Sequence, residues 1–444
     1  MSNKGYIHQT TIAAIATPAG RGGVGIIRIS GPDATAILEQ LSVHRCLPSP
    51  RMATLDAWLD HAGERLDQGI TLYFPGPASY TGEDVVELQG HGGPVLLQAL
   101  LSRLYELGCE PAQAGEFTRR AVEHGKLDLS QAEAVAACID AATVRAGKQA
   151  QRQLQGEFGI HIDRLMQRLT SLVAHVEASL DFPEEEIPDL YFSDLRNKMV
   201  ETVVAPIKEM LASAPLGERL FEGATVALVG APNVGKSSLL NALSGRERAI
   251  VSHLEGTTRD LLDVDFEVNG IPLRLTDTAG LRDSHDVVEI EGVRRALQVA
   301  STADVTLFVA DASRPDTWSP SIHADLLLMN KVDLESGDIP DEYIQLSVIS
   351  GEGLNELRSR LASFLGDIQM GDEGMMVTHE RHRLVLVEAL ECIESGLGCL
   401  GNEELLDLAA MQWRRAWGLL AGILGIGDVE YILDRVFSEF CIGK

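Results

Sequence analysis

The sequence lacks the cysteine pairs that build disulfide frameworks or structural metal sites. Its six cysteines are spread over 444 residues, with no C-x-x-C pair and no spacing typical of metal ligands. Isolated cysteines in so long a chain are typical of reduced thiols in the cytoplasm. We therefore expect free thiols and a cytoplasmic location.

Signals for export or membrane attachment are also missing. The first segment, MSNKGYIHQTTIAAIATPAG, has no sustained apolar core before a cleavage site, and the apolar stretch 417–426 is short and interrupted by glycine. The last four residues, CIGK, place Cys441 where a prenylated cysteine would stand, but Gly443 and Lys444 do not fit that signal and no basic patch precedes it. We expect no signal peptide, no membrane span and no lipid anchor.

The chain carries little positive charge. Its 37 Lys and Arg residues face 65 Asp and Glu residues, for a net charge of −28. A broad, non-specific grip on nucleic acid needs a basic surface, so this balance argues against one without excluding a local basic patch. The arginine pairs 119–120 and 414–415 and the Arg381/Arg383 cluster are candidates for such a patch, although paired arginines on helices are more often salt-bridged at the surface.

The length predicts about three domains, and the pattern of residues changes along the chain in four steps. Residues 1–118 mix strand-like runs such as GVGIIRISG and ATLDAWLD with Gly- and Pro-rich loops. Residues 119–222 are helical, with one apolar stripe from Leu154 to Leu180 that ends before Pro183. Residues 223–370 alternate buried strands with helices, and residues 371–444 are helical again. We predict a multidomain α/β plus α fold, in which a mostly parallel α/β domain is inserted into a helical domain made from both flanks.

The strongest motif is VALVGAPNVGKSS, which fits G-x-x-x-x-G-K-[ST]. It follows an apolar strand and opens a helix, the context in which such a loop binds phosphate. Backbone N–H groups and the helix N-terminus surround the anion, Lys236 reaches the β- and γ-phosphate oxygens, and Ser237 ligates Mg²⁺. The motif predicts a P-loop at Gly230 to Ser237.

Two later motifs identify the base as guanine. IPLRLTDTAG ends a strand at Asp277, placed to hold the water shell of the metal, with Gly280 free to turn toward a γ-phosphate. LLLMNKVD supplies Asn330, Lys331 and Asp333, and a carboxylate at 333 can accept two hydrogen bonds from guanine that adenine does not offer. The three motifs in this order predict a GTPase.

The catalytic group is less evident. Gly256-Thr257-Thr258 is the expected switch segment, with Thr258 as the second hydroxyl on Mg²⁺. Leu281 stands where many GTPases place a water-orienting Gln, so that group must come from elsewhere. The nearby candidates for this catalytic group include Arg282 and Glu289. Charged residues in such a stretch can equally well be solvent-exposed surface residues without a catalytic role. Asn233, inside the P-loop, either ligates a monovalent cation or stabilises a turn.

The GTPase motifs GAPNVGKSSLLNAL, EGTTRD, DTAGLRD and NKVD resemble those of the Era-type GTPases. The flanking motifs SYTGEDVVELQGHGG, GEFTRRAVEHGKLDLSQAEAV, DFPEEEI and FCIGK narrow the resemblance to the family of the tRNA modification GTPase MnmE, also called TrmE. The likeness runs from about residue 10 to residue 444.

The resemblance implies a homodimer, joined through N-terminal tetrahydrofolate-binding domains of α+β type. It also implies an FAD-dependent partner, MnmG (GidA), with which such proteins add an aminomethyl or carboxymethylaminomethyl group to C5 of the wobble uridine of certain tRNAs. The one-carbon unit comes from a 5-formyl- or methylene-tetrahydrofolate, and GTP hydrolysis depends on K⁺ and on dimerisation of the GTPase domains.

Residue roles follow from the same resemblance. Glu289 matches the residue that positions the attacking water, and Arg282 remains a second catalytic candidate. Cys441, held near a one-carbon unit, is either a covalent catalyst or a packing residue. The implied K⁺ ligands are Asn233, Ser252, Leu254 and Thr257, and the implied folate contacts are Arg28, Glu87, Lys126 and Lys444.

The complete set of expected GTP-binding residues combines the P-loop, the switches, the guanine motif and a cap after it. The cap is usually Ser-Ala-Lys but here is Ser347-Val348-Ile349, which predicts a weaker affinity, and the segment between Asp311 and Asn330 is shorter than usual. The set is Asn233, Val234, Gly235, Lys236, Ser237, Ser238, Ser252, Thr257, Thr258, Asp277, Thr278, Ala279, Gly280, Asn330, Lys331, Asp333, Ser347 and Val348.

Two other functions stay open on the sequence alone. A ribosome-assembly GTPase of the Era type would carry an RNA-binding module such as a KH domain, marked by a GXXG loop in a basic context, and we find none. A membrane-associated GTPase would need an anchor or a basic amphipathic helix. The N-terminal motifs favour the tRNA-modifying enzyme.

Overall fold

The computed structural model describes residues 10–181, 189–244, 263–277, 301–320, 323–334, 338–365, 376–427, 430–438 and 440–443. The chain forms two compact units, each built from separate stretches of sequence. The first unit contains Met1–Ala136, Gln153–Glu185 and Asn402–Lys444, and the second contains Ala137–Arg152 and Glu186–Gly401.

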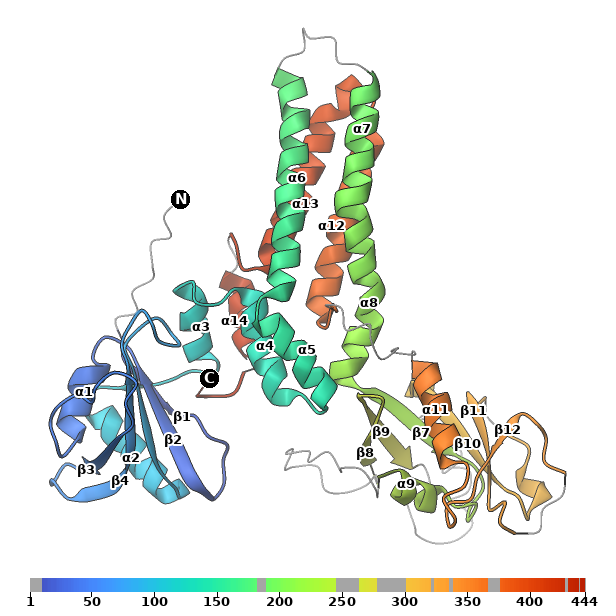
Figure 1. The fold of residues 1–444 in the computed structure, drawn as a ribbon, viewed down its shortest axis with the longest axis horizontal. Helices are drawn as coiled ribbons and strands as arrows, with labels where there is room; N and C mark the ends of the chain where they lie inside the picture. Colours follow the sequence, from blue (N-terminus) through green and yellow to red (C-terminus); the bar gives the residue numbers. More distant parts are fainter. Residues whose placement is uncertain are drawn as a thin grey trace, which may run out of the picture. The chain divides into compact units, whose positions relative to one another are not determined.

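The first unit begins with a six-stranded sheet (Figure 1). Its order is β3-β4-β5-β2-β1-β6, and all neighbours are antiparallel except β1 and β6. Helices α1 (Ala34–Leu41) and α2 (Pro94–Glu106) share one hydrophobic core with the sheet, around Trp58. The strands are β1 (Ile12–Ile15), β2 (Gly22–Ser30), β3 (Thr54–Leu59), β4 (Arg65–Phe74), β5 (Val85–Gly92) and β6 (Glu110–Pro111).

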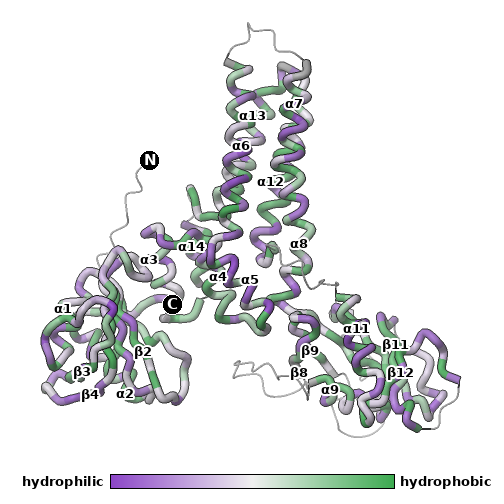
Figure 2. The backbone as a smooth tube through the Cα atoms, in the orientation of Figure 1, coloured by the Kyte–Doolittle hydropathy of each residue, from purple (hydrophilic) through white to green (hydrophobic). Residues whose placement is uncertain are grey.

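The helices of this unit come from both ends of the chain. They are α3 (Glu116–Glu123), α4 (Leu129–Asp140), α6 (Glu157–Asp181), the short η3 (Glu403–Leu405), α13 (Leu406–Ile423) and α14 (Glu430–Ser438). Helices α6 and α13 lie side by side, and their residues alternate between hydrophilic and hydrophobic in Figure 2. This alternation is typical of helices with one buried face.

The predicted apolar helix starts later than the sequence pattern indicates. Leu154 is the last residue of α5 (Val144–Leu154), and α6 begins at Glu157. Between them, Gly156 adopts φ 86°, a left-handed conformation that glycine adopts without steric cost. The prediction of one helix that includes Leu154 is therefore wrong. The apolar residues keep their spacing of three and four across the turn at which one helix ends and the next begins.

The second unit holds the α/β domain predicted between the helical stretches. Its sheet order is β12-β11-β10-β7-β9-β8, with only β8 and β9 antiparallel among the described strands. The strands are β7 (Ala224–Val229), β8 (Asp263–Val268), β9 (Ile271–Asp277), β10 (Val305–Asp311), β11 (Leu326–Asn330) and β12 (Tyr343–Gln345).

Helices surround this sheet and connect it to the rest of the unit. Helix α8 leads directly into β7, and α12, which follows the α/β domain, packs against α8. This arrangement confirms the predicted insertion of an α/β domain into a helical one. The helices are α7 (Asp189–Met199), the π-helical η1 (Val200–Val204), α8 (Ala205–Glu222), α9 (Lys236–Ser244), the short η2 (Pro315–Thr317), α11 (Leu354–Leu365) and α12 (Glu380–Cys399).

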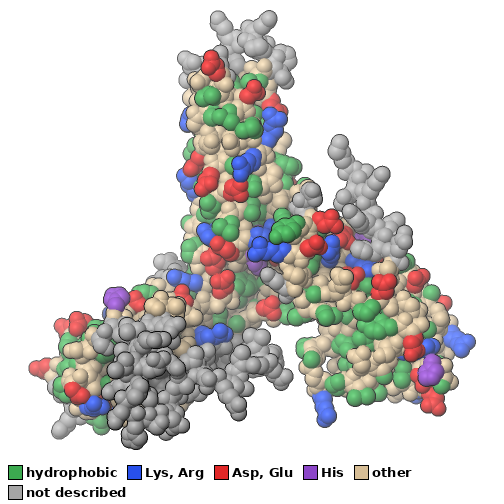
Figure 3. Space-filling view, turned by 180° about the vertical axis from the view of Figure 1, so that it is seen from behind, with side chains coloured by type: hydrophobic (Ala, Val, Ile, Leu, Met, Phe, Trp, Pro, Cys, Tyr) green, Lys and Arg blue, Asp and Glu red, His purple; other side chains and the backbone are tan. Residues whose placement is uncertain are grey.

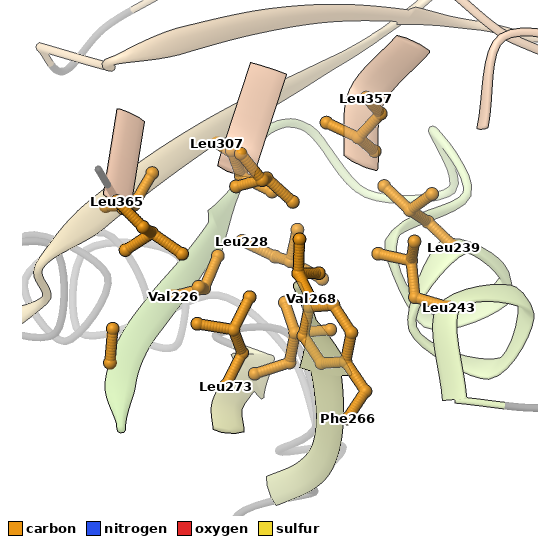
Figure 4. Close-up of a cluster of buried hydrophobic side chains, with 14 of the residues drawn as sticks. Val226, Leu228, Leu239, Leu243, Phe266, Val268, Leu273, Leu307, Leu357 and Leu365 are labelled. Atoms are coloured by element: carbon orange, nitrogen blue, oxygen red, sulfur yellow. The ribbon is translucent and has the colours of Figure 1, made fainter. Parts of the chain in front are cut away.

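The core of the α/β domain explains why its central strands are almost entirely apolar. All seven residues of β10 are buried, as expected for a parallel strand covered on both faces. In Figure 4, Leu239 and Leu243 of α9 and Leu357 of α11 lie on one side of the strand residues Leu228 and Leu307, in the same hydrophobic cluster. This packing holds the carboxyl ends of β7, β10 and β11 together, where parallel sheets place their ligands.

None of the helices in the described part of the chain combines the length and apolar character that crossing a bilayer requires.

Candidate functional sites

The loop between β7 and α9 has the backbone of a phosphate-binding loop. Gly230 and Gly235 have φ angles of 145° and 103°. A Cβ at 230 would overlap the carbonyl oxygen of Val309 on β10, and a Cβ at 235 would overlap the side-chain amide of Asn330. Only glycine fits at both positions, so the loop lies directly against the ends of β10 and β11.

Lys236 is only 5% exposed, and the carbonyl oxygens of its own loop hold it. Its Nζ donates to the oxygen of Gly230 at 2.8 Å and to that of Ala231 at 2.9 Å. The next residue, Ser237, lies exposed in the first turn of α9. A lysine, a helix N-terminus and turned backbone amides are the groups that bind a polyphosphate.

Asn330 joins the guanine motif to this loop. It is buried at the end of β11, and its Nδ2 donates to the carbonyl oxygen of Val234 at 2.8 Å. Its Oδ1 accepts from the backbone N–H of Val348 at 3.3 Å. The P-loop, the guanine motif and the predicted cap therefore meet at one side chain, while Asp333 is exposed and free to face a base.

Lys331 makes a second link between the same segments. Its Nζ donates to the carbonyl oxygen of Asn233 at 3.0 Å and to Oδ2 of Asp311 at 2.6 Å. Burial tends to raise the pKa of the Asp311 carboxyl, but hydrogen bonds from Lys331 and Ser313 outweigh it and hold that pKa below its usual value. The sequence prediction did not include Asp311, although its place opposite Asn330 in neighbouring parallel strands could have indicated it.

The cap, Ser347-Val348-Ile349, is held by hydrogen bonds of its backbone and of Ser347. Ser347 is buried, and its Oγ accepts from the N–H of Ser350 at 3.2 Å. Ile349, which replaces the usual lysine, is 88% exposed. Because these contacts use backbone and serine atoms, they do not depend on the side chains of Val348 and Ile349.

Asn233 and Ser237 are the described members of the predicted cation sites. Both are exposed and carry the oxygen atoms that Mg²⁺ and K⁺ prefer, and Asn233 has φ 65°. Among the residues that the structure describes, no group of three or more His, Cys, Asp or Glu could hold a metal ion. Predicted residues that lie outside the described part, or whose side chain does, are Ser252, Leu254, Thr257, Thr258, Asp277, Thr278, Ala279, Gly280, Arg282, Glu289 and Lys444.

In the first unit, two of the predicted folate residues lie together. Arg28 on β2 is opposite Glu87 on β5, and its Nε and Nη2 donate to Oε1 of Glu87 at 3.0 and 2.9 Å. The guanidinium lies over the rings of Tyr80 and Phe117, at 5.4 and 5.7 Å from their centres. Lys126 is exposed, and its Nζ donates to the carbonyl oxygen of Pro77, in the loop that carries Tyr80.

The C-terminal tail, residues 440–443, lies beside this group. Ile442 forms a β-bridge with Ala114, and Gly115 donates its N–H to the carbonyl oxygen of Cys441 at 3.4 Å. Gly443 has φ 98°, and a Cβ there would overlap the carbonyl oxygen of Ile15 on β1. The tail is therefore seated by its backbone next to the start of α3, the helix that carries Phe117, and the Cys441 thiol is exposed.

Four of the six arginines that were candidates for nucleic-acid contact are paired with acids. Arg120 is 0% exposed, with Nη atoms 3.1 Å from Glu83 and 2.7 Å from Glu116. On the face shown in Figure 3, basic and acidic side chains are interspersed along the helices. The salt-bridged alternative therefore holds for Arg119 with Glu123 and Asp434, Arg120, Arg383 with Glu218 and Glu380, and Arg414 with Glu177.

Comparison with known families matches almost the entire chain. A model of the MnmE helical domain matches residues 129–441, and a model of the GTP-binding protein TrmE N-terminus matches residues 11–126.

Individual relatives extend over the same length. The tRNA modification GTPase MnmE of Pseudomonas syringae pv. syringae is 44% identical, over 99% of this chain and 100% of the relative. The tRNA modification GTPase MnmE of Acinetobacter baylyi is 43% identical, over 98% and 97%. Among solved structures, the FeoB G-domain of Methanococcus jannaschii is 25% identical and covers 32% of this chain and 98% of that one, with a TM-score of 0.25.

Proposed function

This chain belongs to the family of the tRNA modification GTPase MnmE, and we propose that it binds and hydrolyses GTP to modify tRNA. The observation that supports this most directly is the junction at Asn330 and Lys331, which ties the guanine motif to the carbonyl oxygens of the P-loop. Such a junction lets one ligand contact both segments, as a guanine nucleotide does with its base and its phosphates.

Different residues of this chain bind the phosphates, the base and the cations. Lys236 and the turned amides of the P-loop hold the phosphates, and Asp333 accepts from the guanine edge. Ser237 and Thr258 would ligate Mg²⁺, and Asn233, Ser252, Leu254 and Thr257 would ligate K⁺. When bound, these cations offset negative charge that develops on the phosphate oxygens. Glu289, with Arg282 as a second candidate, would orient the attacking water.

We further propose that the N-terminal sheet binds a tetrahydrofolate derivative, as a 5-formyl or methylene form. Arg28 and Glu87 provide a cation for the carboxylates of folate and a carboxylate for its pterin edge, while Lys126 and Lys444 provide further positive charge. The rings of Tyr80 and Phe117 beside Arg28 support this assignment, because a flat heterocycle stacks well on such surfaces.

The finer reaction is proposed on the same basis. A homodimer, acting with the FAD-dependent partner MnmG, would attach an aminomethyl or carboxymethylaminomethyl group to C5 of the wobble uridine. The proposed division is an N-terminal folate and dimerisation domain (1–118), a GTPase domain (223–370) and a helical domain in two parts (119–222 and 371–444). Cys441 is proposed as a participant in the one-carbon chemistry, because its thiol is exposed on a tail that lies beside α3.

The test is nucleoside mass spectrometry on tRNA from cells that lack this gene, complemented with the wild type or with Cys441→Ser. We expect the wobble modification to disappear on deletion and to return with the wild type. Failure of Cys441→Ser to restore it, with normal GTP turnover, supports a chemical role for the thiol, and full restoration refutes that role. An unchanged nucleoside profile on deletion would contradict the tRNA assignment.

A further inference from the structure

We propose that Asp311 is a positioning residue for guanine-nucleotide binding, and that it acts through Lys331. By holding the Lys331 ammonium, Asp311 would keep the recognition segment, residues 330–333, fastened to the P-loop. The proposal rests on the GTP-binding function proposed above. It assigns a role to a residue that belongs to none of the GTPase motifs.

The Asp311 carboxylate has a fixed orientation. The residue is the last of β10 and is 1% exposed. Its Oδ1 accepts from the N–H of Ser313 at 3.0 Å and from the Ser313 hydroxyl at 2.7 Å, which leaves Oδ2 directed at Lys331. Because two donors from Ser313 hold this carboxylate independently of Lys331, it cannot rotate to follow the ammonium and so determines where the ammonium stays.

Lys331 transmits this constraint to the P-loop. Its side chain is 31% exposed, so without a fixed counter-charge the ammonium would gain hydration by turning to solvent. In the structure the same Nζ that binds Asp311 also donates to the carbonyl oxygen of Asn233. Asp311 therefore supports the loop position that also carries a predicted cation ligand.

The burial of the Asp311 carboxylate indicates a functional role. A buried charge destabilises the fold unless it is paired and hydrogen-bonded, and an apolar residue of similar volume is often as stable as a buried ion pair. Asp311 stands at the carboxyl end of β10, opposite Asn330 of β11, which is where parallel sheets bind ligands. The pair is therefore placed to serve the nucleotide rather than the hydrophobic core.

The experiment compares Asp311→Asn with the wild type in an equilibrium titration with a fluorescent guanine nucleotide. The substitution keeps the shape and removes the charge, and we expect affinity to fall by about tenfold, the scale of one charged hydrogen bond. Asp316→Asn is the matched control, because Asp316 lies in the same segment in an exposed pair with Arg314. The control should bind like the wild type. Full affinity in Asp311→Asn, with a wild type that binds, would overturn the proposal.

A double-mutant cycle with Lys331→Met separates positioning from general damage. If Asp311 acts through Lys331, Asp311→Asn should cost no further affinity in the Lys331→Met background. Losses that multiply in the double variant would show that Asp311 acts independently, which overturns the proposal. A wild type that binds no guanine nucleotide would instead refute the proposed function itself.

A stability measurement covers the case in which Asp311→Asn alone does not fold. In the Lys331→Met background, Asp311 is a buried carboxylate without its ammonium. Neutralising it should then raise the unfolding temperature of the Lys331→Met protein. A lowered unfolding temperature would show that the carboxylate stabilises the domain without Lys331 and would contradict the proposed pairing.

Discussion

Each of the two units buries a cation, and the partners of the two cations differ. Arg120 of the first unit lies between the carboxylates of Glu83 and Glu116. Lys236 of the second unit donates to two carbonyl oxygens of its own loop. A carboxylate neutralises part of the charge of a cation, whereas a carbonyl oxygen positions an ammonium group without adding an opposite charge. The partner of a buried cation therefore helps to distinguish a structural role from a binding role.

Arg120→Met should produce the largest effect, on stability. Removing the cation leaves two partly buried carboxylates without their guanidinium partner, which costs about 3–5 kcal/mol. Hydrogen exchange of the amides in the N-terminal sheet measures this loss. Arg119→Met is the control, because Arg119 is partly exposed and should cost no more than about 1 kcal/mol. If Arg120→Met and Arg119→Met had equal, small effects on stability, the structural role of Arg120 would be contradicted.

Lys236→Met should affect binding much more than stability. Without the ammonium, we expect affinity for a guanine nucleotide to fall by about 100-fold or more, the scale for removing a preorganised group that faces developing negative charge. Isothermal titration gives the affinity, and a thermal melt gives the stability. Lys208→Met, which removes a lysine from an exposed pair with Glu394, should change neither quantity. A large loss of stability with retained binding would reverse the assignment of Lys236.

Gly443→Ala tests the C-terminal tail, which is held by backbone contacts and not by a buried cation. A side chain at φ 98° against the Ile15 carbonyl should cost about 1–3 kcal/mol and release the tail. The amides of Ala114 and Gly115 should then exchange faster with solvent. Gly398→Ala, in α12 with open space around it, is the control and should leave that exchange unchanged. Unchanged exchange in Gly443→Ala would contradict the seating of the tail.

The smallest effect concerns the thiols. Burial raises the pKa of Cys109 to about 12, so almost none of it is thiolate at pH 8, whereas Cys46 and Cys441 are exposed. Ellman's reagent should therefore react quickly with these two exposed thiols, and Cys441→Ser should remove half of that fast phase. Cys109 should react only as the pH approaches its raised pKa or on unfolding. If Cys109→Ser reduced the amplitude of the fast phase, Cys109 would be reacting quickly, which would contradict its burial.

Motifs that are contiguous in the sequence could be located from the sequence directly, and their binding of GTP stays a prediction. Gly230 to Ser237 and Asn330 to Asp333 each lie within eight residues or fewer, and their backbone chemistry requires the residue types that stand there. Arg28 and Glu87 were named together only as folate contacts that a family resemblance implies; their pairing was not predicted, because the two residues lie 59 positions apart. The predicted start of α6 was wrong because the turn at Gly156, which separates α5 from α6, leaves the apolar spacing intact.

The amino-acid sequence was enough to predict the insertion of the α/β domain into a helical one and to locate the phosphate and guanine motifs. These depend on local periodicity and on short backbone-directed patterns, which a linear chain displays directly. The folded structure was needed to show which distant groups meet: the charges of Asp311 and Lys331, those of Arg120 and Glu83, and the backbones of Ile442 and Ala114. The physical reason is that pairing depends on burial and on contacts between distant segments, and these exist only once the chain has folded.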